Sequence, residues 1–563
     1  MAEDARNLLC GIPGLTTLSS RTLPHQSSPA RRRAAVFNSP FPDVEIPNLS
    51  VFDYLFGSLD TASADRVALT DGATGEATTY GELVRQIEAL ARALAARGIG
   101  VGSVVALHSP NRPDFAVAFH GILRAGATAT TVNALSTAGE MATQLTDSKA
   151  VAIIAADALF PVSAEAGKLA GVAAERMISL GEVDGSTSLA DMVRETHPAQ
   201  DVSFDPATHL AVLPYSSGTT GKAKGVMLTH RNLVANVAQS ASLVGVTKDD
   251  RVLAVLPFFH IYGMTVLLNI ALAQRANLVT MARFDLADFL GLIQSARITY
   301  VFIAPPIAVA LAKHPLVAEF DLSSLRTVFS GAAPLDGSVG GAVAERLNCE
   351  VLQGYGMTEM SPVSHASPRG RTDIPLNSVG LTVPNIQCRI VDPLTGSDIA
   401  IPTVGVSEPG ELLCRGPNIM VGYLGNDEAT RATLDVDGFL HTGDIATVSA
   451  EGFVTIVDRL KELIKYKGYQ VAPAELEALL LGHPQIADAA VIGVIDADGE
   501  EVPKAFLRLQ PEATLSKEDV MIWVAERVAP HKKVRQVEMI DFIPKSASGK
   551  ILRKDLRSKG ALV

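Results

Sequence analysis

Cysteine is scarce in this sequence of 563 residues, which contains only Cys10, Cys349, Cys388 and Cys414. No two of them form a C-x-x-C pair, so the sequence offers neither a thiolate cage for a metal ion nor a disulfide framework. Cys414 falls in a predicted strand, where we expect a buried, inert thiol rather than a nucleophile. This cysteine usage is typical of reduced thiols and predicts a cytoplasmic protein.

The sequence also has fewer basic than acidic residues, and it lacks long apolar runs. The 48 lysines and arginines are outnumbered by 60 aspartates and glutamates, which gives a formal net charge of −12. A nucleic-acid surface needs an excess of positive charge, so we expect no nucleic-acid partner. The longest apolar region, Ile261 to Ala273, contains Thr265 and Asn269 and is too short to span a membrane. The sequence leaves the oligomeric state open.

Regular periodicity is missing from the first 45 residues, which are rich in Ser, Pro and Arg. Such a segment buries too little apolar surface to fold, so we predict that residues 1–45 form a disordered leader. The first recognisable element begins at Val51. The length of the chain and its 47% hydrophobic content are sufficient for more than one domain with large cores.

Short apolar runs alternate with helical patterns along most of the chain. Val104 to Leu107 and Ala127 to Val132 are predicted strands, with a predicted helix at Asp114 to Arg124 between them. Further predicted strands are Ala150–Ala155, Arg251–Leu256, Thr299–Ile303 and Arg326–Phe329. Strands that are apolar on both faces and separated by helices predict an α/β fold, with parallel or mixed sheets covered by helices. Ligands of such folds bind beyond the carboxyl ends of the strands.

A loop rich in glycine and hydroxyl groups directly follows one predicted strand. The chain reads Y-S-S-G-T-T-G-K-A-K-G-V from Tyr215 to Val226, after the apolar run Leu210 to Leu213. Free backbone N–H groups, hydroxyls and the two lysines, Lys222 and Lys224, suit a polyphosphate. The loop is not a Walker A motif, because its glycines are separated by two residues rather than four.

Four further motifs follow in order: G-Y-G-M-T-E (Gly354 to Glu359), H-T-G-D (His441 to Asp444), D-R-L-K-E-L-I-K-Y-K-G-Y-Q-V (Asp458 to Val471) and P-K-S-A-S-G-K-I-L-R (Pro544 to Arg553). With the loop, they resemble the adenylate-forming enzymes, which include acyl-CoA synthetases, the adenylation domains of peptide synthetases and beetle luciferase. The likeness runs from about Val51 to Arg557.

The flanking sequence is most similar to the 4-coumarate–CoA ligase branch of these enzymes. The stretches that carry this likeness are P-F-F-H-I-Y (Pro257 to Tyr262), S-G-A-A-P-L (Ser330 to Leu335) and G-P-N-I-M-V-G-Y-L (Gly416 to Leu424). Medium-chain fatty acyl ligases share much of the same sequence. The resemblance therefore implies an acid that is either a hydroxycinnamate-like aryl acid or a medium- or long-chain fatty acid.

The resemblance implies two domains and a two-step reaction. Residues 46–458 would form a large N-terminal adenylation domain, and residues 459–563 a small α+β lid that swivels at a hinge between Asp458 and Arg459. The first step joins the acid to ATP and gives an acyl-adenylate and pyrophosphate. In the second step the thiol of CoA takes the acyl group and AMP leaves. ATP and CoA are the implied co-substrates, and Mg²⁺ is the implied cofactor.

The resemblance also assigns roles around ATP. Glu359 would hold Mg²⁺, Lys550 would bridge the substrate carboxylate and the α-phosphate, and Asp444 and Arg459 would contact the ribose. Without the motifs, Lys550 would be interpreted as a solvated lysine and Glu359 as a residue of a helical first turn. The implied ATP- or AMP-binding residues are Ser216, Ser217, Gly218, Thr219, Thr220, Lys224, Ala332, Gln353, Gly354, Tyr355, Thr358, Asp444, Arg459 and Lys461.

Further roles follow from the resemblance for the thioester step. Lys465 would contact the adenylate and is, with Lys550 and His260, an implied catalytic residue; His260 would gate the acyl tunnel. The implied CoA contacts are Arg283, Lys467 and Gly468. Gly468 suits that role because the missing side chain lets the pantetheine arm pass close to the backbone. The alternative for this segment is an exposed strand whose lysines protect its edge.

The implied acyl pocket comprises Tyr262, Gly263, Val266, Ser330, Gly331, Pro362, Val363 and Ser364. Val266 replaces a small polar residue that is common in the family, and Ser364 replaces an apolar one. An apolar pocket with few hydrogen-bonding groups discriminates weakly between aryl and alkyl chains.

Three other functions fit parts of the same pattern. An adenylating enzyme that loads a carrier protein would need an aspartate near Pro257 to Tyr262 to hold an α-amino group, and that stretch has none. A luciferase-like protein shares the adenylate chemistry, and the sequence leaves it open. A catalytically dead nucleotide-binding scaffold is disfavoured by the intact set Lys224, Glu359, Asp444, Lys465 and Lys550.

Overall fold

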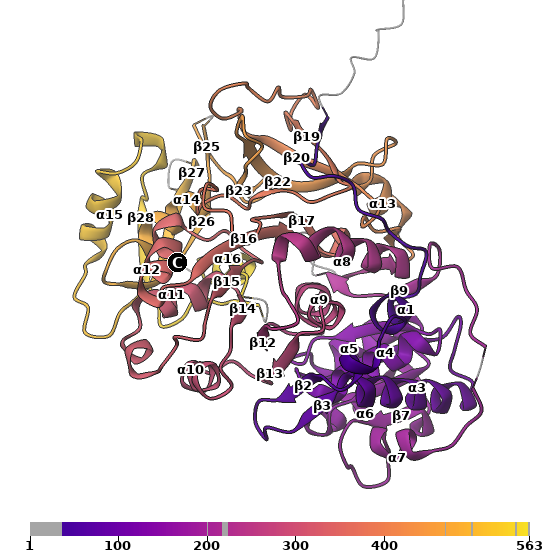
Figure 1. The fold of residues 1–563 in the computed structure, drawn as a ribbon. Helices are drawn as coiled ribbons and strands as arrows, with labels where there is room; N and C mark the ends of the chain where they lie inside the picture. Colours follow the sequence, from indigo (N-terminus) through magenta and orange to yellow (C-terminus); the bar gives the residue numbers. More distant parts are fainter. Residues whose placement is uncertain are drawn as a thin grey trace, which may run out of the picture. The chain divides into compact units, whose positions relative to one another are not determined.

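The computed structural model describes residues 36–199, 201–216, 223–467, 469–496, 499–546 and 549–560. Within these ranges the strands form two nine-stranded sheets, one five-stranded sheet and two small sheets, accompanied by helices (Figure 1). The predicted α/β fold, with a large N-terminal domain and a smaller C-terminal domain, is confirmed. Across the same residues, no helix is long and apolar enough to cross a membrane.

The first sheet holds the strand that precedes the glycine-rich loop. Its central strands β5, β4, β6 and β7 run parallel. All five residues of β5 are buried, as expected for a parallel strand that is covered on both faces. In spatial order the strands are β10 (Tyr215–Ser216), β11 (Lys224–Thr229), β9 (Leu210–Val212), β5 (Thr128–Val132), β4 (Val104–His108), β6 (Ala152–Ala155), β7 (Met177–Ser179) and β8 (Thr187–Ser188), and β21 (Gly422–Tyr423) pairs with β11.

Two strands of the second sheet, β15 and β16, lead into the sequences S-G-A-A-P-L and G-Y-G-M-T-E. Six adjacent strands, β16, β15, β14, β12, β13 and β2, run parallel, so their carboxyl ends meet at one edge. In spatial order the sheet contains β18 (Leu381–Thr382), β17 (Val363–Ala366), β16 (Glu350–Gly356), β15 (Thr327–Ser330), β14 (Tyr300–Ile303), β12 (Arg251–Ala254), β13 (Asn277–Thr280), β2 (Val67–Asp71) and β3 (Ala77–Thr79).

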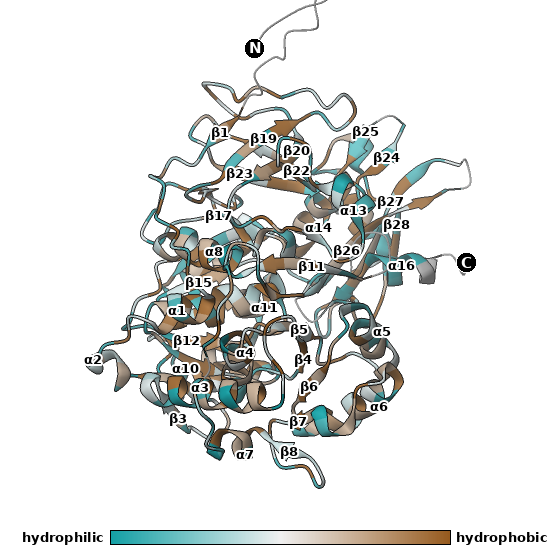
Figure 2. Ribbon diagram, turned by 90° about the vertical axis from the view of Figure 1, so that its right-hand side faces the viewer, coloured by the Kyte–Doolittle hydropathy of each residue, from teal (hydrophilic) through white to brown (hydrophobic). Residues whose placement is uncertain are grey.

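Helices of the N-terminal domain begin where their sequences provide caps. Thr79 and Thr137 form capping boxes with a glutamate three residues later, and Pro113 and Pro305 occupy first helical positions. Hydrophilic and hydrophobic residues are interspersed along α3 and α6 (Figure 2). The helices are α1 (Val51–Phe56), α2 (Thr61–Ala64), α3 (Tyr80–Ala96), α4 (Pro113–Arg124), α5 (Ala138–Ser148), α6 (Phe160–Ala170), α7 (Leu189–Arg194), α8 (His230–Val244), the π-helix η3 (Tyr262–Asn269), α9 (Ile270–Ala273), α10 (Leu286–Ser295), α11 (Pro305–Lys313), α12 (Gly337–Leu347) and α13 (Asp427–Thr433).

The third sheet corrects the predicted end of the leader. Its strands are β1 (Phe37–Asn38), β19 (Gln387–Val391), β20 (Gly410–Arg415), β22 (Leu440–Val448) and β23 (Val454–Arg459). Phe37 pairs with Cys388, and the Val44 N–H donates to the Asn385 side chain at 3.1 Å. The prediction of a disordered segment is therefore wrong for residues 36–45. A strand of two residues has no periodicity that sequence reasoning could detect.

The C-terminal domain has cores of its own. Its elements are β24 (Ile464–Tyr466), β25 (Tyr469–Val471), α14 (Pro473–Leu481), β26 (Ile486–Ile495), β27 (Glu501–Leu509), α15 (Lys517–Ala525), β28 (Gln536–Met539) and α16 (Arg553–Gly560). Buried side chains from Ile464 to Val537 form one cluster, separate from the main cluster, which ends at Val454. The predicted hinge between Asp458 and Arg459 falls between these two clusters and stays a prediction.

Candidate active site

The carboxyl ends of two neighbouring strands, β15 and β16, meet at one edge of the second sheet. Ser330, the last residue of β15, pairs in register with Gln353 of β16. The Gln353 amide donates a hydrogen bond to the Leu335 carbonyl at 3.1 Å and accepts one from the Leu335 N–H at 3.2 Å. These bonds fix the loop from Ser330 to Leu335, in which Ala332 has a left-handed φ of 70°. Gln353 was predicted to contact the adenylate; its side chain holds the neighbouring loop.

Tyr355, Asp444 and Arg459 form a second group, although they lie far apart in the sequence. Asp444 of β22 pairs in register with Arg459 of β23, and the Arg459 Nε lies 3.4 Å from one oxygen of the carboxylate. The Tyr355 hydroxyl donates to the other oxygen at 2.6 Å. Asp444 is only 5% exposed, and burial raises the pKa of its carboxyl while the Arg459 charge opposes the rise. The structure thus brings both predicted ribose contacts together.

Lys550 of the C-terminal domain reaches the same group. Its pKa is lowered to about 8, chiefly by burial and then by the Arg459 charge, while the Asp444 and Glu359 carboxylates oppose the shift. The Lys550 charge also helps to lower the pKa of His260 to about 4, although burial of the imidazole is the main cause. The charge of Lys550 therefore interacts with those of Asp444, Arg459 and Glu359, and it also acts on His260. The role predicted for Lys550 stays a prediction.

Glu359 lies in a short 3-10 turn, η5 (Thr358–Met360), and is 5% exposed. Its Oε1 accepts hydrogen bonds from the Ser216 hydroxyl at 3.2 Å and from the Tyr423 hydroxyl at 2.9 Å. The Lys224 Nζ lies over the Tyr423 ring, 4.8 Å from its centroid. Sequence reasoning gave Tyr423 no role, although the residue lies in a motif that carried the resemblance. The structure adds Tyr423 to the site.

Several predicted residues lie at the surface or outside the described ranges. The side chains of Lys461, Lys465, Lys467 and Arg283 are exposed. Lys467 has a left-handed φ of 47° at the turn between β24 and β25. The predicted residues that lie outside the described ranges are Ser217, Gly218, Thr219, Thr220 and Gly468. The roles assigned to all of these residues stay predictions.

The buried helix η3 carries the first part of the predicted acyl pocket. It is a π-helix, a form that is frequent at functional sites. Among the described residues, the buried hydroxyls of Tyr262 and Thr265, the Asn269 carboxamide and the Ser330 hydroxyl have no hydrogen-bond partner. A Cβ built on Gly331 would lie 2.9 Å from the Tyr262 ring, so this ring covers the backbone that follows Ser330. The Tyr262 hydroxyl therefore lies close to Gly331, the residue that follows Ser330.

Gly263, another member of the predicted acyl pocket, packs closely against main chain, and its role in the pocket stays a prediction. A Cβ built on Gly263 would lie 2.0 Å from the Pro257 carbonyl oxygen, which is far inside any contact distance. Gly263 therefore faces the main chain of the segment before η3, and its missing side chain permits that close approach. Val266, the next predicted member on this helix, is fully buried.

The remaining predicted pocket residues lie at the start of β17. Val363 opens the strand, and the Asn236 side chain holds it by donating to its carbonyl at 2.7 Å and accepting from its N–H at 3.1 Å. Pro362 directly precedes the strand. The buried Ser364 hydroxyl lies 3.0 Å from the His365 Nδ1 and so has its partner within the sheet.

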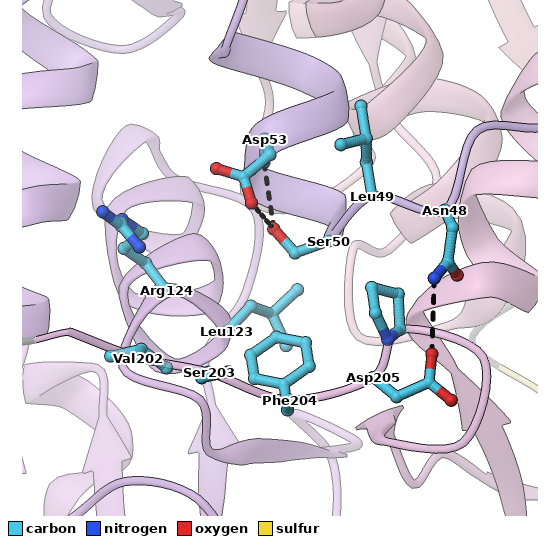
Figure 3. A pocket seen from close by; sticks show the side chains of 11 residues that line it. Asn48, Leu49, Ser50, Asp53, Leu123, Arg124, Val202, Ser203, Phe204 and Asp205 are labelled. Atoms are coloured by element: carbon cyan, nitrogen blue, oxygen red, sulfur yellow. Dashed lines mark hydrogen bonds between the residues drawn. The ribbon is translucent and has the colours of Figure 1, made fainter.

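A surface pocket of about 530 Å³ lies elsewhere, beside the start of α1 and the end of α4 (Figure 3). Its polar groups serve local structure: Ser50 caps α1 by accepting from the Asp53 N–H at 3.1 Å, and Asn48 donates to Asp205 at 3.4 Å. None of the described residues predicted for the active site lines it. We therefore place the candidate site at the motif loops.

Two family models match the chain. The model described as AMP-binding enzyme matches residues 59–424, and the model described as AMP-binding enzyme C-terminal domain matches residues 475–550. The chain therefore belongs to the AMP-binding enzyme family, as the adenylate-forming motifs predicted.

Within this family, similar proteins are 4-coumarate–CoA ligases. The chain is 41% identical to 4-coumarate–CoA ligase 5 of Oryza sativa subsp. japonica over 535 residues, which cover 93% of this chain and 97% of the relative. It is 42% identical to 4-coumarate–CoA ligase 2 of Solanum tuberosum over 539 residues, with coverages of 93% and 96%. The predicted resemblance to this branch is confirmed.

Solved structures share the fold over nearly the whole chain. ATP-bound MatB from Rhodopseudomonas palustris superposes with a TM-score of 0.82 at 29% identity and covers 91% of this chain and 99% of its own. The anthranilate–CoA ligase AuaEII in complex with anthranoyl-AMP gives a TM-score of 0.84 at 27% identity, with coverages of 92% and 98%.

Proposed function

We propose that the protein is an AMP-forming carboxylic acid–CoA ligase, which converts an acid, ATP and CoA into acyl-CoA, AMP and pyrophosphate through an acyl-adenylate. One observation carries the proposal: Asp444, Arg459 and Tyr355 form a bonded group, and the charge of Lys550 from the C-terminal domain interacts with those of Asp444, Arg459 and Glu359. This group supplies a cation where a carboxylate and a phosphate must meet. Membership of the AMP-binding enzyme family and relatives named as CoA ligases support the same reaction.

The first step requires charge compensation rather than a protein nucleophile. A carboxylate oxygen of the acid attacks the α-phosphorus of ATP, an oxygen–phosphorus bond forms, and pyrophosphate leaves with the electron pair of the broken bond. Both reactants are anions, so the enzyme must bring them together and stabilise the charge that develops. Lys550 would supply the ammonium group. Its lowered pKa of about 8 leaves it mostly protonated at neutral pH.

We assign the phosphates of ATP to the glycine-rich loop, with Ser216 and Lys224, and the Mg²⁺ site to Glu359. A single carboxylate suits Mg²⁺, which proteins usually hold through one or two carboxylates together with substrate phosphates. When bound, Mg²⁺ would neutralise charge on the phosphate oxygens. Tyr423 would orient the Glu359 carboxylate through its hydrogen bond.

We assign the ribose to Asp444 and Arg459, and the CoA thiol to the other face of the lid. Lys467 of the lid has an exposed side chain, so we infer that the lid turns about the predicted hinge for the second step, while Arg283 would contact CoA from the N-terminal domain. The hinge would divide residues 46–458 from residues 459–563. Its position between the two segments matched by family models, 59–424 and 475–550, supports this division.

We propose that the acid is hydroxycinnamate-like rather than a fatty acid. Each buried hydroxyl that lacks a partner costs about 1–3 kcal/mol, so the hydroxyls of Tyr262 and Ser330 favour a ligand that can pair with them. A hydroxylated aromatic ring provides such groups, and an alkyl chain does not. The names of the 4-coumarate–CoA ligase relatives support the same choice.

We also propose that the enzyme works in the cytoplasm, on small molecules only. Cys388 and Cys414 lie on the paired strands β19 and β20 with their sulfurs 3.7 Å apart, and both are free thiols. A reducing compartment maintains this state. The formal net charge of −12 disfavours a nucleic-acid partner.

A panel of acids tests the proposal. Pyrophosphate release and acyl-CoA formation are measured with 4-coumarate, cinnamate and decanoate, each with and without CoA. We expect kcat/KM for 4-coumarate to exceed that for cinnamate by about fivefold, because one buried hydrogen bond is worth about 1 kcal/mol. Tyr262→Phe is the matched variant and should reduce that ratio. Release of pyrophosphate with none of the acids would refute the ligase, and equal values for 4-coumarate and cinnamate would refute the polar pocket.

A further inference from the structure

One helix of the N-terminal domain, α11, contacts the C-terminal domain at both of its ends. At its start, a Cβ built on Gly549 would lie 2.8 Å from the Ala304 Cβ and 3.8 Å from Pro306. At its end, the Lys313 Nζ donates hydrogen bonds to main-chain carbonyls of the lid. The nine residues of α11 span about 13 Å, so the two contacts are separated by a rigid element of fixed length.

The first contact involves the residue next to Lys550. Gly549 has a left-handed φ of 83°, and its lack of a side chain lets the lid loop approach the start of α11. The position of Lys550 therefore depends on how closely this loop approaches the start of α11.

In the second contact, Lys313 caps the C-terminal end of α14. Lys313 donates to the carbonyl oxygens of Leu481, His483 (3.3 Å) and Ile486 (3.5 Å). An ammonium group has three donors, and a cation is favoured at a helix carboxyl end, where carbonyls lack intrahelical partners. The Lys313 side chain is half-buried, and this burial lowers its pKa.

We propose that Lys313 is a positioning residue that latches the lid in the orientation that delivers Lys550 to the acid and ATP. The inference rests on the proposed two-step ligase function. A lid that turns to present Lys467 to the site must withdraw Lys550, and it leaves α11 as it does so. The latch therefore favours the first orientation over the second, and Lys313 acts on the first half-reaction without touching a substrate.

Arg346 provides a matched control within the N-terminal domain. Its Nη1 donates to the carbonyls of Leu311 and Ala312, at 3.1 and 3.0 Å, and so caps the end of α11 itself. Arg346→Met removes a long cation from the end of the same helix, and the two hydrogen bonds that it removes stay within the N-terminal domain. Lys313→Met removes a similar cation and the three bonds to the lid.

The experiment assays the two half-reactions separately in full-length wild type, Lys313→Met, Lys313→Arg and Arg346→Met. The first is 4-coumarate-dependent ATP–pyrophosphate exchange, and the second is thioester formation from synthetic 4-coumaroyl-adenylate and CoA. Loss of one charged hydrogen-bond cluster should reduce exchange about tenfold in Lys313→Met while thioester formation is retained. Lys313→Arg should recover most of the exchange, and Arg346→Met should change both steps equally or not at all.

Amide hydrogen exchange over residues 482–490 gives a second readout that does not depend on turnover. We expect faster exchange there in Lys313→Met than in Arg346→Met or Lys313→Arg. Equal loss of both half-reactions in Lys313→Met, or unchanged amide exchange in that variant, would overturn the latch. If wild type neither exchanges pyrophosphate nor forms the thioester, the proposed function fails, and the amide exchange result still decides whether Lys313 holds the lid.

Discussion

Two lysine-bearing segments of the C-terminal domain differ sharply in their surroundings. Lys550 is half-buried beside Asp444 and Arg459, and its pKa is lowered to about 8. Lys465 and Lys467, by contrast, have exposed side chains at the small β24–β25 sheet. We interpret this difference as one orientation of a lid with two working faces, with the adenylate-forming face engaged and the CoA face in solvent.

The largest effect should come from the engaged segment. Lys550→Ala should reduce ATP–pyrophosphate exchange by roughly 10²-fold or more, as removal of a donor that stabilises a charged transition state does elsewhere. Thioester formation from pre-formed acyl-adenylate should stay close to normal. Lys554→Ala, which changes an exposed lysine of the same segment, is the control. Equal losses in both half-reactions would show that the two faces do not have separate tasks.

The exposed segment should show the opposite pattern. Gly468→Trp places bulk where the pantetheine arm is expected to pass. A steric cost of about 1–3 kcal/mol corresponds to a fall in thioester formation of about 5- to 150-fold. Adenylate formation should continue. A variant that is slow in the exchange assay but normal with CoA would reverse the assignment of the faces.

A third test uses pH to compare the two segments. The pKa of Lys550 is depressed from 10.5 to about 8, so its charged form is lost as the pH rises through about 8 in the free enzyme. The kcat/KM for ATP in the exchange reaction should therefore decline about tenfold per pH unit well above that value. Lys550→Arg should remove the decline because its guanidinium stays protonated. Lys465→Arg should leave the pH profile unchanged. If the decline shifts in Lys465→Arg and stays in Lys550→Arg, Lys550 is not the group responsible for it.

The smallest expected effect concerns the partner of Glu359. Tyr423→Phe removes one hydrogen bond to Glu359 Oε1, worth about 0.5–1.5 kcal/mol, and should raise the Mg²⁺ concentration for half-maximal exchange by a few-fold. Tyr215→Phe removes the hydroxyl that bonds Asp147 at 2.5 Å and is the matched control. The same change in both variants would mean that Tyr423 does not act through Glu359.

The fold class could be predicted from the sequence because the evidence was periodic and repeated. The strand predicted at Ala127 to Val132 is observed as β5 (Thr128–Val132), and the helix predicted at Asp114 to Arg124 is observed as α4 (Pro113–Arg124). Strand β1 was missed because two residues carry no periodic signal, and its pairing partner lies about 350 positions away.

Some features of the candidate site could likewise be predicted from the sequence, and others could not. Motifs identified Asp444, Arg459 and Lys550, and the register of β22 and β23 explains why the first two meet. Motifs could not show that Gly263 faces the Pro257 carbonyl, because that depends on the path of a neighbouring segment. They also could not show that the Gln353 amide is used to hold the adjacent loop. Contacts between distant segments decide such roles, and spacing within one motif does not contain them.

The position of Lys550 has a thermodynamic consequence for movement of the lid. The engaged Lys550 has a pKa of about 8, whereas a lysine returned to water has its ordinary value of 10.5. Between these values, withdrawal of the lid moves Lys550 from a mainly neutral to a mainly charged state. Lid opening is then accompanied by proton uptake, and alkaline solution favours the engaged orientation by mass action. For the lid movement that we propose, the resting position in that pH range is then a function of proton concentration.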